Sequence, residues 1–91
     1  MDYEVKHLPS ESRFEVDLDG MSAYLDYHLS GNVINLFHAY TPPEFRGKGI
    51  AAAVAKFALD YARANNLKVI PQCPYVKDYV SKHKEYQDLV N

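Results

Sequence analysis

The sequence of 91 residues lacks the features that mark several large classes of protein. Its single cysteine excludes an internal disulfide and favours a reducing compartment such as the cytoplasm. Without a basic block, and with a net charge of −2, it has no electrostatic footprint of a nucleic-acid binder. No apolar run approaches the length of a membrane span, and the first residues do not resemble a signal peptide. We therefore expect a cytoplasmic protein that binds neither nucleic acid nor membrane.

The sequence also has no pattern of a metal site, because no cluster of cysteine, histidine and carboxylate residues has the spacing of a zinc site. What the sequence does contain is a hydrophobic content of 47%, which is typical of a globular protein. A chain of this length forms one domain, so we expect residues 1–91 to be a single unit with a modest core. We expect a monomer or a weak dimer.

Alternating apolar and polar residues predict four strands in the first half of the sequence. Asp19-Gly20 is a strong signal for a tight hairpin, and Ser30-Gly31-Asn32 marks the next turn. These short connections leave no room for a helix and predict an antiparallel meander. The expected strands cover residues 3–8, 14–18, 23–29 and 33–41.

The spacing of apolar residues changes to a helical period after Gly49. A helix is expected over about residues 48–65, with an apolar stripe, and a short apolar strand over residues 67–72. The strand–helix–strand connection predicts that this last strand runs parallel to the strand before the helix. A second helix should begin near Pro74, which gives the order ββββαβα and a mostly antiparallel α/β fold. The expected stripe consists of Ile50, Val54, Phe57 and Tyr61, flanked by alanines.

The stretch Arg46-Gly47-Lys48-Gly49 lies where the first helix is expected to begin. The first amides of a helix have no internal partner, and the helix dipole favours an anion there. Glycines allow a phosphate to approach the backbone closely, and Arg46 and Lys48 add positive charge. By chemistry alone this is a candidate phosphate cradle. The alternative is an ordinary glycine-containing loop before a surface helix.

The spacing Arg46-x-x-Gly49-x-Ala51 resembles the acetyl-CoA signature of the GNAT N-acetyltransferases, Gln/Arg-x-x-Gly-x-Gly/Ala. A longer agreement, from His38 to Val90, is similar to the short single-domain GNAT subgroup labelled YjdJ-like. One departure is Lys84, where that subgroup commonly has proline. Larger GNAT enzymes carry helices between the first strands that shape the acceptor site, and this sequence resembles the family core without them.

The resemblance implies acetyl-CoA as co-substrate and an amine as acetyl acceptor. In the GNAT fold the parallel strands splay apart, and the pantetheine arm lies in the opening. By this resemblance the backbone from Gly47 to Ala51 would hold the pyrophosphate, and the strand end near Tyr40 would pair with pantetheine. The implied cofactor-binding residues are Tyr40, Thr41, Arg46, Gly47, Lys48, Gly49, Ile50, Ala51 and Tyr75.

Cys73 and His38 are the candidate catalytic residues. Cys73 is either a small buried residue or a thiol beside the acetyl group, where a helix start would favour the thiolate. His38 is either a structural strand residue or a base that accepts the proton of the amine. We expect the other histidines to be structural or exposed, and Tyr75 and Tyr79 are candidates for the acid that protonates the departing CoA thiolate.

Two mechanisms and two functions follow from these residues. Either the amine attacks the thioester directly in a ternary complex, or Cys73 takes the acetyl group first; direct attack is preferred because proximity already supplies much of such a reaction. The expected function is an acetyl-CoA-dependent N-acetyltransferase acting on an unidentified amine. The alternative is a non-catalytic CoA-binding or interaction module, which the short chain favours.

Overall fold

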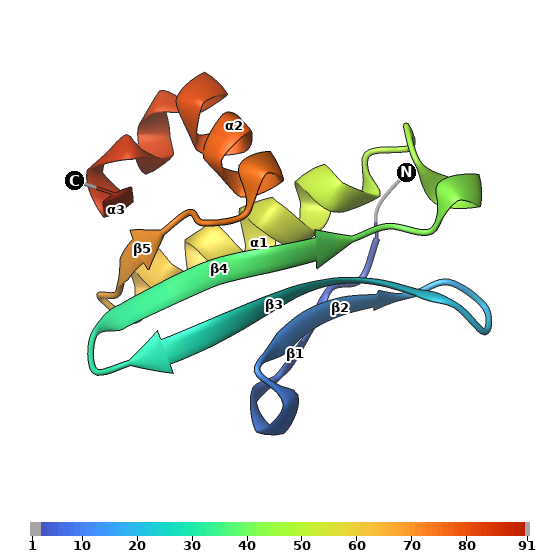
Figure 1. Cartoon of the computed structure of the whole chain (residues 1–91), viewed down its shortest axis with the longest axis horizontal. Helices are drawn as coiled ribbons and strands as arrows, with labels where there is room; N and C mark the ends of the chain where they lie inside the picture. The colour runs from blue at the N-terminus through green and yellow to red at the C-terminus, as the bar shows by residue number, and fades with distance from the viewer. Residues whose placement is uncertain (1–2, 91) are drawn as a thin grey trace.

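The computed structural model describes residues 3–90, which form a five-stranded sheet with its helices on one side (Figure 1). The strands lie in sequence order, antiparallel from β1 to β4 and parallel between β4 and β5. None of the described helices is both long and apolar enough to cross a membrane. Residues 1, 2 and 91, the ends of the expected domain, lie outside the described residues.

The predicted order ββββαβα is confirmed, with additional short turns of helix. The first strand begins at Lys6 rather than Tyr3, and the carboxyl-terminal tail forms a 3₁₀ turn and a short helix. The strands are β1 (Lys6–Leu8), β2 (Arg13–Asp17), β3 (Ser22–Ser30), β4 (Val33–Tyr40) and β5 (Lys68–Ile70). The helices are α1 (Ile50–Ala64), α2 (Pro74–Lys82) and α3 (Gln87–Val90), with 3₁₀ turns η1 (Pro9–Glu11), η2 (Pro43–Phe45) and η3 (Lys84–Tyr86).

A tight turn joins β2 to β3, as the Asp-Gly pair predicts. Asp19 has φ 53° and Gly20 has φ 92°, the two positive angles of a type I′ turn. The amide of Leu18 donates to the carbonyl of Met21 over 2.8 Å and closes the hairpin. This turn fixes the register that places Phe14 opposite Leu25, both buried on the helix side of the sheet.

A β-bulge interrupts β4 and is the main irregularity of the sheet. Tyr27 pairs with Leu36, but the preceding residue Asp26 pairs with His38, so Phe37 is an extra residue on β4. Because side chains alternate along a strand, the extra residue reverses which face each later side chain occupies. Leu36 and Ala39 therefore share the helix side, and His38 turns to the open side.

Helix α1 packs against the sheet through small side chains. Ala58 and Ala62 are fully buried, so the helix backbone approaches the strands closely. The expected apolar stripe is wrong in part, because Phe57 is 38% exposed and Leu59 is fully buried. The buried face is centred on the alanines, and Phe57 and Tyr61 lie on its flank.

The flanking aromatic residues of α1 join a cluster around Phe14, which lies on β2 opposite Leu25. The Phe14 ring lies 4.6 Å from the ring of His7 and 5.6 Å from that of Tyr61. His7 Nε2 and the Tyr27 hydroxyl are 2.7 Å apart, and burial lowers the pKa of His7. His7 therefore has a structural place, as expected.

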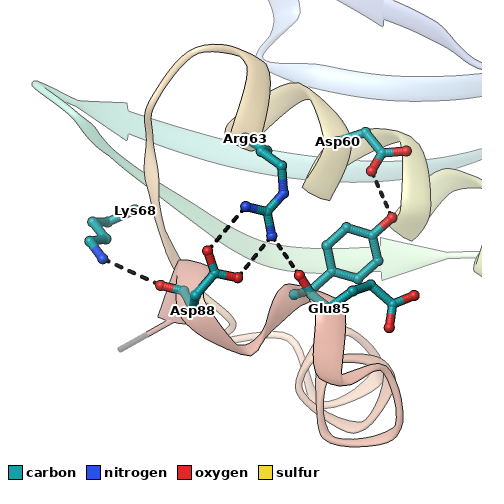
Figure 2. A network of polar contacts seen from close by, with 6 residues as sticks. Asp60, Arg63, Lys68, Glu85 and Asp88 are labelled. Atoms are coloured by element: carbon teal, nitrogen blue, oxygen red, sulfur yellow. Dashed lines mark hydrogen bonds and ion pairs between the residues drawn. The ribbon is translucent and has the colours of Figure 1, made fainter.

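The carboxyl-terminal tail is held against α1 by polar contacts (Figure 2). Arg63 donates to both carboxylate oxygens of Asp88, over 3.0 and 2.8 Å, and to the backbone carbonyl of Glu85. The hydroxyl of the buried Tyr86 donates to Asp60 over 2.6 Å. Burial, followed by this hydrogen bond, raises the pKa of Tyr86 to about 12. These contacts secure the segment that carries the unexpected Lys84.

We predict that Tyr86→Phe lowers the free energy of unfolding by about 1–2 kcal/mol, because it removes a hydrogen bond to a carboxylate and keeps the buried ring. Urea denaturation followed by circular dichroism measures this. Tyr79→Phe is the matched control, since in the described structure its hydroxyl has no hydrogen-bond partner. Equal stability of both variants would contradict the role given to the Tyr86 hydroxyl.

Candidate functional site

Strands β4 and β5 separate partway along their length. They pair from Val33 opposite Lys68 to Asn35 opposite Ile70, and the amide of Cys73 then donates to the carbonyl of Leu36 over 2.9 Å. Beyond Leu36, β4 continues to Tyr40 without a described strand on this side. The bulge directs the backbone amide and carbonyl of Ala39 toward this gap, because hydrogen-bonding directions alternate along a strand.

The loop that follows β4 presents free amides. Gly47 and Gly49 have φ 79° and 81°, and Gly49 is the N-cap of α1. Such angles are unfavourable for residues with a Cβ, so glycine is favoured at both positions. Within residues 3–90, no acceptor pairs with the backbone amides from Gly47 to Ala52. The loop and helix start together form a concave set of donors suited to an anion.

The two cations of the loop take different positions. Arg46 donates through Nε to the carbonyl of Thr41 over 3.0 Å, which holds its guanidinium beside the end of β4. Lys48 is not among the residues that line the cleft described below, and it lines a neighbouring groove. Neither side chain has a carboxylate partner among the described residues. Arg46 alone therefore adds a full charge directly to the candidate phosphate site.

A cleft of about 420 Å³ opens where these features meet. It runs from the free edge of β4, over the loop, to the first turn of α2, and a smaller apolar niche of about 10 Å³ lies beneath it. Three of its lining residues are alanines, whose small side chains leave room beside the backbone. The cleft is lined by Ala39, Tyr40, Thr41, Phe45, Arg46, Gly47, Gly49, Ile50, Ala51, Ala52 and Tyr75.

Most of the expected cofactor-binding residues thus come together in the cleft, and Lys48 does not. Ala39, Phe45 and Ala52 line the cleft but were not identified from the sequence. Ala39 is placed there by the bulge, which had no sequence signal. Ala52 follows Ala51 in the first turn of α1, so the helical period was the available signal for it.

Tyr75 closes the cleft from α2. Its side chain is 38% exposed, and burial of the hydroxyl raises its pKa, followed by smaller effects of Tyr79 and Asp78. The phenol therefore keeps its proton at neutral pH and can donate a hydrogen bond into the cleft. Its ring centroid lies 6.4 Å from that of Tyr79, which is outside the lining.

His38 lies outside the residues that line the cleft, on the open side of the sheet. Its ring is 5.9 Å from the ring of Tyr24, and the guanidinium of Arg13 lies 3.8 Å above that same ring. Arg13 also donates to Asp26 over 2.6 Å, and this hydrogen bond raises the pKa of Arg13. The described helices leave this side uncovered, so the imidazole is exposed to solvent.

Cys73 is 5% exposed and belongs to the hydrophobic core. It is the N-cap of α2, and its carbonyl accepts the amide of Lys77 over 3.0 Å. Its backbone amide donates to the carbonyl of Leu36, but Cys73 is not among the residues that line the cleft. The structure brings neither Cys73 nor His38 into the cleft itself.

The fold and the cleft define a class of protein. Splayed parallel strands, a glycine-bearing loop with free amides and a helix start form a site for an extended ligand with an anionic group. Residues 13–89 match the family model described as GCN5-related N-acetyl-transferase. The chain belongs to the GCN5-related N-acetyltransferase (GNAT) family, and an N-acetyltransferase with acetyl-CoA as co-substrate is the activity that family and fold support.

Related proteins share this sequence over most of its length. Protein NATD1 of Gallus gallus is 35% identical over 83 residues, which cover 88% of this chain and 76% of that protein. Protein NATD1 of Homo sapiens is 35% identical over 82 residues, with 87% and 73% covered. The NMR solution structure of a GCN5-like protein from Staphylococcus aureus superposes with a TM-score of 0.76, at 31% identity, covering 96% of this chain and 86% of that one. The YjdJ-like subgroup stays a prediction.

Proposed function

We propose that residues 1–91 form one acetyl-CoA-binding domain that transfers acetyl to an amine by direct attack. The observation that carries this proposal is the set of unpaired amides from Gly47 to Ala52 at the mouth of the cleft. These amides would bind the diphosphate of CoA, and the Arg46 guanidinium would add charge beside them. Glycine at 47 and 49 lets the phosphates approach without contact with a Cβ.

The pantetheine arm would lie along the free edge of β4. Its amides are strand-like donors and acceptors, and Ala39 offers a backbone amide and carbonyl toward the gap. Ala39, Ala51 and Ala52 leave space for the chain, and the ring of Tyr75 would cover it. The thioester would then reach the point where β4 and β5 separate, near Leu36 and Cys73.

The acceptor amine would approach from the open side of the sheet. There its nitrogen attacks the thioester carbonyl carbon, His38 accepts the proton released by the amine, and the C–S bond breaks to release CoA thiolate. Tyr75 would donate a hydrogen bond to that thiolate. Burial of Cys73 supports direct attack over an acetyl-cysteine intermediate, because a nucleophilic thiol needs access to the thioester.

The first test is a calorimetric titration with CoA and acetyl-CoA, followed by amide chemical-shift mapping. We expect shifts from Gly47 to Ala51, and then release of CoA when peptide amines and polyamines are offered as acceptors. Binding without CoA release for any amine would support the alternative, a non-catalytic CoA-binding module, which the absence of acceptor-side helices in the described structure favours. Absence of binding would overturn both.

We predict that Cys73→Ala keeps its affinity for acetyl-CoA and retains measurable transfer, reduced by less than about tenfold. The reason is that direct attack needs Cys73 for packing beside the thioester and not as a nucleophile. Initial rates and intact mass after incubation with acetyl-CoA are the measurements, and His83→Ala is a control outside the cleft. An acetylated wild-type protein together with an inactive alanine variant would establish the covalent route instead.

An amine as the acceptor, the monomeric or weakly dimeric state and the cytoplasmic location stay predictions from the sequence.

A further inference from the structure

A second hollow lies on the other flank of the α1 start. It has a volume of about 480 Å³, and the segment before β1 forms one wall while α1 forms the other. Gly49 lines both this groove and the cleft, so the two hollows meet at the loop. The Tyr3 hydroxyl donates to the carbonyl of Lys48 over 3.3 Å and ties the segment to the loop.

The groove combines positive charge with an apolar wall. Lys48, Lys56 and Asp60 are its charged lining residues, which leaves an excess of one positive charge, and within residues 3–90 Lys48 has no acidic partner. Lys56 donates to Asp60 over 2.9 Å, but both side chains are largely exposed, so this ion pair is weak. Lys56 can therefore contact an anionic ligand in its place. The same carboxylate also accepts the Tyr86 hydroxyl, which compensates part of its charge.

Val5, Ala53 and the partly exposed ring of Phe57 form the apolar part of the groove. A flat aromatic base can lie against such a surface. The groove therefore offers, within one hollow, a surface for a base and two ammonium groups for a phosphate.

We infer that this groove binds the 3′-phosphoadenosine end of CoA, with Lys48 and Lys56 contacting the 3′-phosphate and Phe57 contacting the base. The inference rests on the proposed function, because the diphosphate must first occupy the amides of the loop. CoA carries two anionic groups, the diphosphate and the 3′-phosphate on its ribose. The amides of the loop would bind only the diphosphate. Lys48 is a cation next to the diphosphate site that does not line the cleft. The groove that it lines meets the loop at Gly49.

The test compares CoA with dephospho-CoA, which lacks only the 3′-phosphate. Wild-type protein should bind CoA about tenfold more tightly at low salt, and Lys48→Gln with Lys56→Gln should remove that preference while changing affinity for dephospho-CoA less than about twofold. Lys82→Gln, at the far end of α2, makes the same change in charge outside both hollows and should keep the preference. Higher salt should narrow the difference between the two ligands.

Equal wild-type affinity for CoA and dephospho-CoA, or an equal loss for both ligands in the double variant, would overturn the inference. Amide shifts separate this failure from failure of the proposed function. Shifts from Gly47 to Ala51 without shifts at Ala53 and Phe57 would support the diphosphate site and contradict binding of phosphoadenosine in the groove. Absence of binding by either ligand to the wild type would overturn both proposals.

Discussion

Gly49→Glu is expected to abolish CoA binding and to leave the fold in place. A Cβ at this position meets nothing within 4 Å, so the protein itself has room for the side chain. The positive φ of 81° makes the substitution unfavourable by about 1–2 kcal/mol, which a folded domain tolerates. The carboxylate, however, would stand among the amides proposed to bind diphosphate. Juxtaposed like charges cost several kcal/mol, which corresponds to at least about a hundredfold loss of affinity.

Gly31→Glu is the matched control for this variant. Gly31 also has a positive φ, 58°, and free space around its Cβ position, but it lies in the β3–β4 turn. Both variants therefore place a glutamate at a position with positive φ and add one negative charge, and only Gly49 lines the cleft. We expect Gly31→Glu to bind CoA as the wild type does in a calorimetric titration. Unaltered affinity in Gly49→Glu would show that the loop is not the diphosphate site.

Much of the fold could be predicted because it is encoded by local signals. Asp19-Gly20 fixes a type I′ turn, and that turn sets the pairing of Phe14 with Leu25. The change from alternating to helical spacing after Gly49 locates α1, and the strand–helix–strand rule then makes β5 parallel to β4. The turn and the position of α1 follow from neighbouring residues in the sequence, and the direction of β5 follows from the general rule for strand–helix–strand connections.

The bulge at Phe37 could not be predicted, because it depends on how β4 pairs with β3. Regular alternation from Ile34 and Leu36 would place His38 on the helix side, and the extra residue places Ala39 there instead. This single irregularity decides which residues of β4 face the helix side, where Ala39 lines the cleft, and it turns His38 to the open side. Alternation of apolar and polar residues along a strand predicts which side of the sheet each side chain faces only where no bulge interrupts the strand.

The position of Lys48 shows a second limit of the sequence. Arg46 and Lys48 are equivalent cations in the loop, and both were expected at the pyrophosphate. Two residues with positive φ, Gly47 and Gly49, flank Lys48, so the backbone turns on each side of it, and Lys48 lines the neighbouring groove instead of the cleft. Proximity in sequence to a phosphate loop therefore does not establish that a cation faces the phosphate.

Phe14→Ala is expected to cause the largest loss of stability in the domain. The Phe14 ring is fully buried on β2 and contacts the rings of His7, Tyr27, Phe57 and Tyr61, which join the sheet to α1. Removing such a ring costs about 3–5 kcal/mol, from lost transfer free energy and from the cavity that remains. A domain of this size has a stability of about 5–15 kcal/mol, so a large share would be lost.

Urea denaturation measures this change, and Phe37→Ala supplies the same change of residue at a site that is 43% exposed. There we expect a loss within about 1 kcal/mol, because little buried surface is removed. Phe14 lies outside the residues lining the cleft, so the folded fraction of Phe14→Ala should bind CoA with unchanged affinity. Similar losses at Phe14 and Phe37 would show that the aromatic cluster does not hold α1 to the sheet. If CoA affinity fell with stability, ligand binding would depend on the packing of the aromatic cluster, which reaches the groove through Phe57.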